Sequence, residues 1–263
     1  MRNHGDVTST RYRELAPPPG LEALVACVWV SHDGEVRVLP DACVDVVLSG
    51  GRLVVAGPAT AATLAPATPG QARVGVRFRV GAAGTALGVP AGELRDQGVP
   101  LAELWGSDAR RLEDRVVAAD DPHAALLALI GGVATRLPAP EDADHEVRRA
   151  ALALARPAAG QDDTATVAAS ARAAGLSERQ LRRRFERAVG YGPATLARVL
   201  RFQRFLHHAH APGSADAPLA RLAADAGYAD QAHLARECRR LAGIPPSALL
   251  ATGATPAGEP TRS

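Results

Sequence analysis

The sequence predicts an α+β protein: a β-rich N-terminal domain with following helices, then an all-α C-terminal domain of two helix-turn-helix units joined by a long helix. Three observations support this fold class. Short runs rich in β-branched residues and separated by Gly or Pro extend to about residue 80. Apolar residues at helical spacing follow from about Ala91. After Thr164, a helix, a glycine and a second helix occur twice.

Five apolar runs predict the strands of the N-terminal domain. They are "LVACVWV" (24–30), "VRVLP" (36–40), "CVDVVLS" (43–49), "RLVVAG" (52–57) and "ARVGVRFRV" (72–80). In the last run, valines and Phe78 alternate with Arg73, Arg77 and Arg79. Successive side chains of a strand point to opposite faces, so this run predicts a strand that is buried on one face only.

Four segments between residues 91 and 137 predict the helices that follow, namely "AGELRDQG", "LAELWG", "DARRLEDRVVAA" and "PHAALLALIGGVATRL". A polar, proline-bearing stretch then precedes a short helix from Val147 to Ala155 and a linker, "RPAAGQDD". We therefore divide the chain into residues 1–157, residues 158–250 and a disordered tail over residues 251–263.

Composition limits the class of protein. The 263 residues are 47% hydrophobic and 22% charged, which is enough apolar material for a sizeable core. No apolar run approaches the roughly 20 residues that span a bilayer, and the N-terminus lacks the apolar segment of a secretory signal. We expect a cytoplasmic protein without a membrane partner. Cys27, Cys43 and Cys238 are odd in number and widely spaced, which favours ordinary reduced thiols.

The charge is unevenly distributed, although the net charge is only +2. Residues 1–157 carry 16 Arg and 19 Asp or Glu, a net charge of −3, whereas residues 158–250 carry 13 Arg and 8 Asp or Glu, a net charge of +5. The chain contains no lysine, so every fixed cation is a guanidinium, which pairs well with phosphate or a guanine edge. Genome composition explains the arginine excess equally well.

The first helix-turn-helix unit lies in "TVAASARAAGLSERQLRRRFERAVG". It predicts a helix over 165–174, a break at Gly175 and a second helix, with Ser177 as N-cap and Gln180 completing a capping box. The inward stripe of the second helix is Leu181, Phe185, Ala188 and Val189. The opposite, outward face carries Arg179, Arg182, Arg183 and Glu186.

The second unit lies in "PLARLAADAGYADQAHLARECRRLAG". It predicts a helix over 219–226, a break at Gly227 and a helix capped by Asp230, with Leu234, Cys238 and Leu241 inward. The outward positions are Gln231, Ala232, His233 and Arg236. The segment between the units predicts one long connecting helix over 193–210, with Leu196, Leu200, Gln203 and Leu206 at helical spacing. The Pro pair of "GIPPSAL" ends the last helix of the second unit.

Residues 164–250 resemble the DNA-binding domain of the AraC/XylS family of transcription regulators, which has two helix-turn-helix units joined by a long helix. The matching segments are "AASARAAGLSERQLRRRF" and "AADAGYADQAHLARECRRLAGIPPSAL". Cys238 departs from the aromatic residue that is usual there. Residues from about 10 to 106, including "LPDACVDVVLSG", "GVRFRVGAAGTALGVP" and "VPLAELWG", resemble an uncharacterised domain that precedes this DNA-binding domain in some bacterial regulators.

The resemblance implies a sequence-specific transcription regulator with a sensor or dimerisation domain at residues 1–157 and a DNA-binding domain at residues 158–250. Double-stranded DNA is the principal partner that it implies. RNA polymerase, a small-molecule effector and a second copy of the chain are the other partners. A recognition helix fits the major groove, where Arg, Gln and His reach base edges or phosphate. The expected DNA-binding residues are Ser177, Arg179, Gln180, Arg182, Arg183, Glu186, Gln231, Ala232, His233 and Arg236.

A small polar site is the candidate for ligand binding in the N-terminal domain. "PDACVD" places Asp41 and Asp45 four residues apart, and Arg77 and Arg79 lie on a nearby strand. The alternative, that the aspartates hold a turn and the arginines are solvated, stays open.

No cofactor, metal site or catalytic constellation is expected, so we do not predict an enzyme. The histidines at 207, 208 and 210 lack a nearby carboxylate or thiol that would complete a metal site. One alternative function is a DNA-repair or DNA-modifying enzyme that borrows the same DNA-binding domain. That class would need an activated cysteine, either Cys27 or Cys43. Another alternative is a structural DNA-associated protein, which would show no sequence preference.

Overall fold

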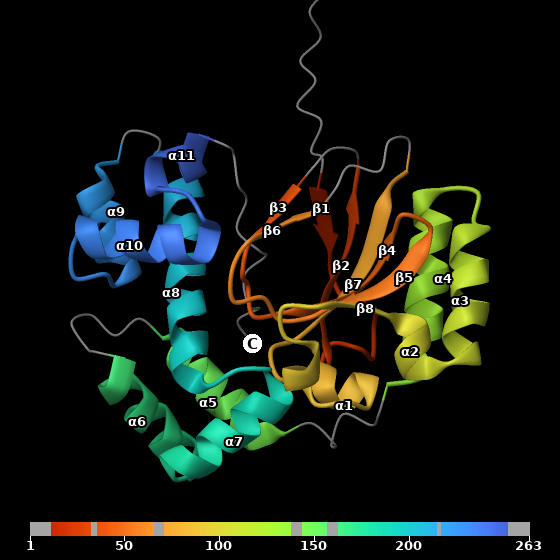
Figure 1. Cartoon of the computed structure of the whole chain (residues 1–263), viewed down its shortest axis with the longest axis horizontal. Helices are drawn as coiled ribbons and strands as arrows, with labels where there is room; N and C mark the ends of the chain where they lie inside the picture. The colour runs from red at the N-terminus through yellow and green to blue at the C-terminus, as the bar shows by residue number, and fades with distance from the viewer. Residues whose placement is uncertain are drawn as a thin grey trace, which may run out of the picture.

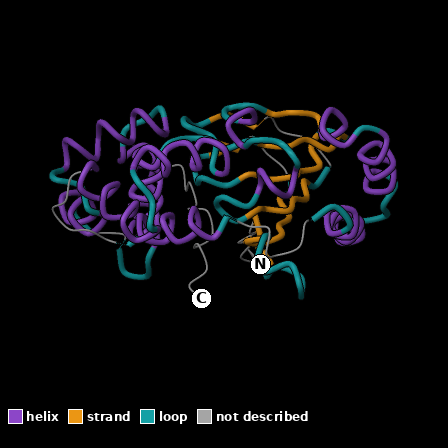
Figure 2. The backbone as a smooth tube through the Cα atoms, turned by 90° about the horizontal axis from the view of Figure 1, so that it is seen from below, coloured by secondary structure: helices purple, strands orange, loops and turns teal. Residues whose placement is uncertain are grey.

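The chain folds into a central sheet with helices on either side. The structure is a computed structural model that describes residues 12–32, 36–65, 71–137, 144–156, 163–214 and 217–251. The sheet lies between a pair of helices, α3 and α4, and a larger group of C-terminal helices (Figures 1 and 2). The chain is therefore α+β, with the strands in its N-terminal part and an all-helical C-terminal part, as the sequence predicts.

The main sheet has six antiparallel strands in the order β1-β2-β7-β4-β5-β8. Its strands are β1 (Tyr12–Leu15), β2 (Val25–Ser31), β7 (Arg73–Phe78), β4 (Val44–Ser49), β5 (Arg52–Ala56) and β8 (Gly98–Pro100). A second sheet pairs β3 (Val36–Val38) with β6 (Thr63–Ala65). Each of the five apolar runs contains a strand. The three strands that the sequence does not predict, β1, β6 and β8, have only three or four residues each.

Two glycines form the tight turn between β4 and β5. Gly50 and Gly51 have φ angles of +58° and +75°, and Ser49 pairs with Arg52 across the turn. A two-residue hairpin turn of this kind needs positive φ at both central positions, which glycine adopts without strain. This turn fixes the register that aligns Val46 with Val55 in the core.

The helices of the N-terminal part are α1 (Ala83–Leu87), the 3₁₀ helix η1 (Ala91–Leu94), α2 (Leu101–Trp105), α3 (Ser107–Val117) and α4 (Pro122–Ala134). Of these, α2, α3 and α4 contact strands of the sheet, and α1 and η1 contact α7 (Glu178–Ala188). Leu126 and Leu129 of α4 share one buried core with Val46 and Val76 of the sheet. Gly132 lets α4 approach α3 closely, because a Cβ there would lie 2.2 Å from Leu112 Cδ1.

The expectation that β7 is buried on one face only is wrong. β7 lies between β2 and β4, and Arg73 is only 7% exposed. On the face opposite the valines, the indole of Trp29 packs over Gly75, where a Cβ would lie 2.3 Å from the ring. The alternation of apolar and charged residues is present in the sequence, but Trp29 of β2 covers part of the charged face and carboxylates pair with Arg77 on it.

Seven helices of the described chain form the C-terminal part. They are α5 (His145–Ala155), α6 (Asp163–Ala174), α7 (Glu178–Ala188), α8 (Pro193–His210), α9 (Leu219–Ala226), α10 (Gln231–Ala242) and α11 (Pro246–Ala251). The bounds of α5 to α10 agree closely with the expected helices. α11 was not predicted, because Gly243 ends α10 with a φ angle of +74° and the Pro pair lies at the start of a further helix. α5 packs against α6, α7 and α8, so this helical unit begins N-terminal to the expected boundary at residue 157. The expected tail starts at the last residue of α11, and residues 252–263 lie outside the described chain.

The two parts of the molecule share a core. Leu39 and Ala42, which precede β4, are buried in the same apolar cluster as Phe185 and Phe202 of the C-terminal helices. Among the described helices, none is long and apolar enough to cross a membrane.

The packing of Trp29 over Gly75 gives a test of the sheet. We expect Gly75→Ala to lower the free energy of unfolding by about 1–3 kcal/mol, because the added methyl overlaps the indole ring. Urea unfolding followed by circular dichroism measures the change. Gly98→Ala is the matched control, since the nearest atom to a Cβ there is Val54 Cγ1 at an ordinary 3.5 Å. Equal stability of the two variants would contradict the packing described here.

Candidate nucleic-acid interface

The first helix-turn-helix unit consists of α6, a turn at Gly175 and α7. Gly175 has a φ angle of +70°, and the Leu176 N–H returns to the Ala171 carbonyl at 3.0 Å, which closes α6 and redirects the chain. The predicted capping box at the start of α7 is present. The Ser177 N–H donates to Gln180 Oε1 at 2.9 Å, and the Gln180 N–H donates to Ser177 Oγ at 3.3 Å. Both side chains therefore serve the start of the helix.

The outward face of α7 is the arginine-rich surface that the helical spacing predicts. Leu181 and Phe185 are fully buried on the inward side. The outward residues Arg179, Arg182, Arg183 and Glu186 are all exposed.

Two further arginines of α7 were not singled out by the sequence analysis. Arg187 is exposed one turn after Arg183, a spacing that could have identified it. Arg184 instead joins α7 to the start of α5, since its Nη1 contacts Asp144 Oδ1 at 3.2 Å and Glu146 Oε2 at 3.1 Å. A groove of about 510 Å³ lies beside these contacts and is lined by Asp144, Arg183, Arg184 and Arg187.

The second unit repeats this geometry with α9, a turn at Gly227 and α10. Gly227 has a φ angle of +89°, and Asp230 Oδ1 accepts from the His233 N–H at 2.6 Å at the start of α10. The predicted inward residues Leu234, Cys238 and Leu241 are buried. The outward residues Gln231, Ala232 and Arg236 are exposed. His233 is half-buried, and its ring packs edge-on against Tyr228 with 5.2 Å between the centroids.

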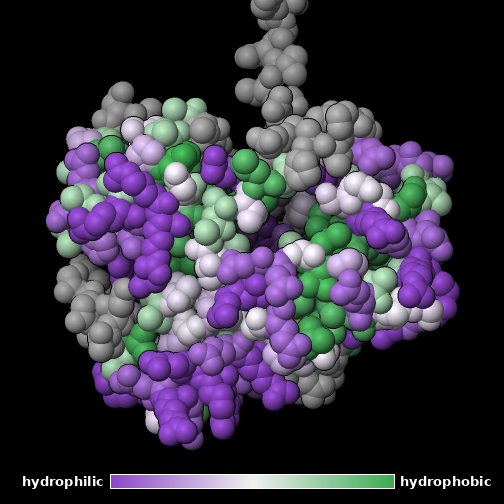
Figure 3. Space-filling model, viewed as in Figure 1, coloured by the Kyte–Doolittle hydropathy of each residue, from purple (hydrophilic) through white to green (hydrophobic). Residues whose placement is uncertain are grey.

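Polar contacts join α8 to both helices of the second unit and to α5. Arg198 Nε lies 3.3 Å from Glu237 Oε2 of α10. Arg204 donates to the Ala226 carbonyl at the end of α9 at 3.0 Å and to the Ala155 carbonyl at the end of α5 at 3.1 Å. Burial lowers the pKa of Arg204 from its ordinary value, and the nearby Arg201 charge acts in the same direction. In the space-filling view, hydrophilic residues gather over α7 and over α9 and α10 (Figure 3).

Three of the four residues expected in the N-terminal polar site come together. Arg77 Nη2 lies 3.0 Å from Asp45 Oδ2 and 3.2 Å from Asp41 Oδ2. Arg77 Nη1 also contacts Glu14 Oε1 at 3.2 Å, and Glu14 was not predicted as part of this site. Arg79 lies apart, because its Nε donates to the Glu22 carbonyl. Asp41 also holds a turn by accepting from the Cys43 N–H at 2.9 Å, so both readings of this aspartate apply.

The guanidinium of Arg77 forms ion pairs with three carboxylates in this polar site. Burial acts to lower the pKa of Arg77, but the charges of Asp45 and Asp41 outweigh it and raise that pKa well above its ordinary value. Arg77 therefore stays charged. Burial raises the pKa of Asp45 despite the attraction of Arg77. Asp45 thus binds its proton more tightly in the folded chain than in the unfolded chain.

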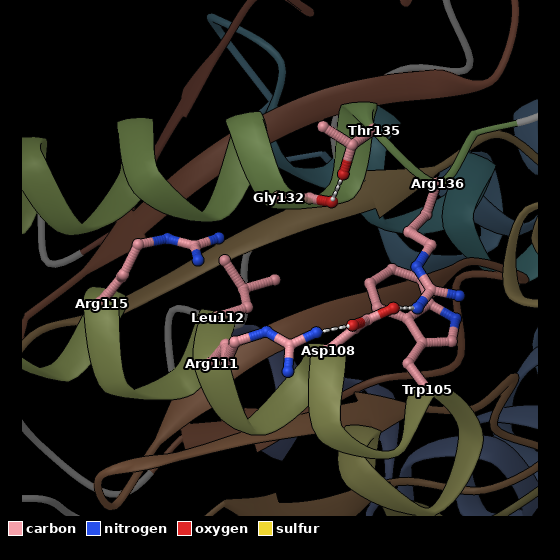
Figure 4. A pocket seen from close by; sticks show the side chains of 8 residues that line it. All are labelled: Trp105, Asp108, Arg111, Leu112, Arg115, Gly132, Thr135 and Arg136. Atoms are coloured by element: carbon pink, nitrogen blue, oxygen red, sulfur yellow. Dashed lines mark hydrogen bonds and ion pairs between the residues drawn. The ribbon is translucent and has the colours of Figure 1, made fainter.

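A small cavity of about 180 Å³ lies between α3 and α4. Figure 4 shows Arg111 and Arg136 on either side of Asp108, and both pair with its carboxylate. The Arg136 guanidinium also lies over the Trp105 ring, 5.5 Å from its centroid. These side chains are engaged with one another, and the volume is below the several hundred Å³ of a typical ligand pocket. The cluster joins two helices, and we assign no ligand to it.

Two family models match separate parts of the chain. Residues 170–252 match a helix-turn-helix domain, and this range includes both turns, the connecting helix α8 and α10. Residues 13–100 match a domain of unknown function (DUF6597), a range that includes every strand of the described sheets except the first residue of β1. No protein with a curated description and no solved structure matches the chain.

The buried ion pairs of Arg77 generate a test of the polar site. We expect Arg77→Met to lower the free energy of unfolding by about 3–5 kcal/mol at pH 7, because it leaves buried carboxylates uncompensated. Without the cation, the pKa of Asp45 rises further above its unfolded value. The stability of the variant therefore falls as pH rises through the interval between the two values. Urea unfolding from pH 4 to 8 should show the loss growing with pH. The matched control, Arg79→Met, should show no such pH dependence. If Arg77→Met lost the same stability at pH 4 and at pH 8, Arg77 would not be the cation that compensates Asp45.

Proposed function

Because the chain joins an AraC-type helix-turn-helix domain to an N-terminal domain of unknown function, we propose that it is a sequence-specific transcription regulator. A ligand or partner at the N-terminal domain would control it. The observation that carries this proposal is the pair of exposed recognition-helix faces, on α7 and α10, which one continuous helix joins.

The two recognition helices are suited to the major groove. On α7, the guanidinium groups of Arg179, Arg182 and Arg183 would pair with guanine edges or phosphate. On α10, Gln231, His233 and Arg236 would reach other base edges, with His233 limited by its packing against Tyr228. Ser177 and Gln180 stand at the start of α7, where free N–H groups favour a phosphate. Glu186 and Ala232 complete the proposed contacts.

We propose that the polar site formed by Asp41, Asp45 and Arg77 responds to an effector. Its ion pairs are satisfied internally, so an effector would act by competing for Arg77 or its carboxylates. Arg79 is not part of these ion pairs, so it could contact an effector only at the edge of the polar site. The regulator would work in the cytoplasm with RNA polymerase, and a homodimer is its proposed assembly.

The cysteines give no support to the alternative of a DNA-repair or DNA-modifying enzyme. Such an enzyme would need a thiolate at neutral pH. Burial raises the pKa of Cys27 to about 12 and that of Cys43 well above its ordinary value. Both thiols are therefore protonated near pH 7.

The arginines of α7 provide the direct test of DNA binding. We expect Arg182→Ala and Arg183→Ala each to cost about 1–3 kcal/mol of specific binding if the side chain reads a base. If the side chain contacts phosphate, the slope of log affinity against log salt should fall by about one. Binding is measured by fluorescence anisotropy on a DNA site selected by the wild-type chain from a random library. Arg110→Ala, an exposed arginine of α3, is the control. If both α7 variants bound DNA as the wild-type chain does, α7 would not be a recognition helix.

The spacing between the two recognition helices gives an independent test. The 18 residues of α8 make a helix about 27 Å long. If both helices enter successive major-groove segments, their base contacts lie about one helical turn, roughly 10 base pairs, apart. Inserting about five base pairs turns one contact to the opposite face and should greatly weaken binding. Inserting about ten restores the face but exceeds the reach of α8, so affinity should stay low. Full recovery at ten would contradict a rigid pair of units.

A further inference from the structure

The N-terminal domain occupies the carboxyl end of the second recognition helix, α10. The last carbonyls of a helix have no partner within the helix, so another group must satisfy them. The Ala62 N–H donates to the Leu241 carbonyl at 2.7 Å, and Arg37 Nη1 donates to the Ala242 carbonyl at 3.0 Å. A cation at this end also interacts favourably with the helix dipole. Residues from the N-terminal domain thus cap α10.

The same domain packs tightly against the carboxyl end of the first recognition helix, α7. A Cβ on Gly92 would lie 2.9 Å from the Glu186 carbonyl oxygen, and one on Gly84 would lie 3.0 Å from the Arg187 carbonyl oxygen. A side chain at Gly92 would force the backbone of α7 to move, and one at Gly84 would be tighter than an ordinary contact. Just beyond α7, Arg95 Nη1 donates to the Gly190 carbonyl at 3.4 Å.

The N-terminal domain also contacts α8, the helix that joins the two units. Gln203 of α8 donates through Nε2 to the Pro40 carbonyl at 2.6 Å. Leu39 and Ala42, on either side of that contact, are buried in the core of the C-terminal helices. The N-terminal domain therefore contacts three helices of the C-terminal part, α7, α8 and α10.

These contacts leave the proposed DNA-binding faces open. They engage the carboxyl ends of α7 and α10, whereas Arg182, Arg183, Gln231 and Arg236 are exposed on the outward faces. The contact of Glu186 with Gly92 is made by its backbone carbonyl, and its side chain remains exposed. The arrangement supports the two units without covering their outward faces.

We propose that the N-terminal domain sets the relative orientation of the two recognition helices by holding their carboxyl ends, with Arg37, Gly92 and Arg95 as positioning residues. The inference rests on the proposed function, since orientation matters only for DNA that both units contact at once. Without these contacts, the two units would be aligned only by the packing of the C-terminal helices themselves. If the orientation of the two units is not fixed, binding to a DNA site that both units contact must also restrict their motion. This restriction costs conformational entropy and lowers the affinity.

The experiment compares two DNA probes with full-length variants. One probe is the site selected by the wild-type chain, and the other is the same site with one of its two contact segments scrambled. We expect Arg37→Ala to weaken binding to the intact site about tenfold, the typical effect of losing one charge-assisted contact. Gly92→Ala should also weaken it, because the added methyl would displace the Glu186 carbonyl at the end of α7. Both variants should leave binding to the scrambled site within about twofold. The matched controls are Arg13→Ala, at an exposed arginine of β1, and Gly131→Ala, where a Cβ meets nothing within 4 Å.

The comparison of the two probes distinguishes a positioning role from a general loss of folded protein. Equal losses on the two probes, or no loss on either, would overturn the positioning role, since a general loss of folded protein weakens both probes alike. Arg37 is on a two-stranded sheet at the surface, so its variant tests the idea even if Gly92→Ala fails to fold. A wild-type chain that selects no DNA sequence would overturn the proposed function and this inference together, whereas selective binding with unaltered variants overturns the inference alone.

Discussion

The arrangement of the C-terminal half depends on the packing of α8. This helix places Phe202, Phe205 and Leu206 at full burial, and it packs against α5, α6, α7, α9 and α10. Apolar burial alone would hold these helices together without fixing their ends, because it has no direction. Arg204 fixes the ends of α5 and α9 relative to α8, because it donates hydrogen bonds to the last carbonyl group of each of these two helices. The distance between the recognition helices follows from the length of α8 and from which of its faces each unit covers.

Elements that end at local signals could be predicted from the sequence. The start of α7 follows from its capping box, the start of α10 from the Asp230 cap, and the ends of α9 and α10 from glycines with positive φ. These hydrogen bonds join residues only three or four positions apart. The exposed face of α7 follows from helical periodicity in the same way. Short strands such as β8 carry too few residues to show a pattern, and they exist because a neighbouring strand pairs with them.

Features that depend on distant partners could not be predicted. Gln203 is among the residues whose helical spacing predicts α8, but its acceptor is 163 residues away in the chain. Arg184 belongs to the arginine-rich helix by sequence, yet the acidic start of α5 occupies it. The candidate polar site was recognised from Asp41, Asp45 and Arg77, whereas Glu14 joins them only because β1 pairs with β2 and thereby lies near β7.

The close approach of backbone at Gly84 and Gly92 has a consequence for the response to ionic strength. A contact between main-chain atoms carries no net charge, so dissolved salt screens it little. Arginine contacts with phosphate weaken steeply as salt rises, because binding releases counterions from the DNA. A rise in salt should therefore detach the protein from DNA long before it separates the sheet from the C-terminal helices. The freed molecule would keep its two recognition helices in register, ready to bind again when the salt falls.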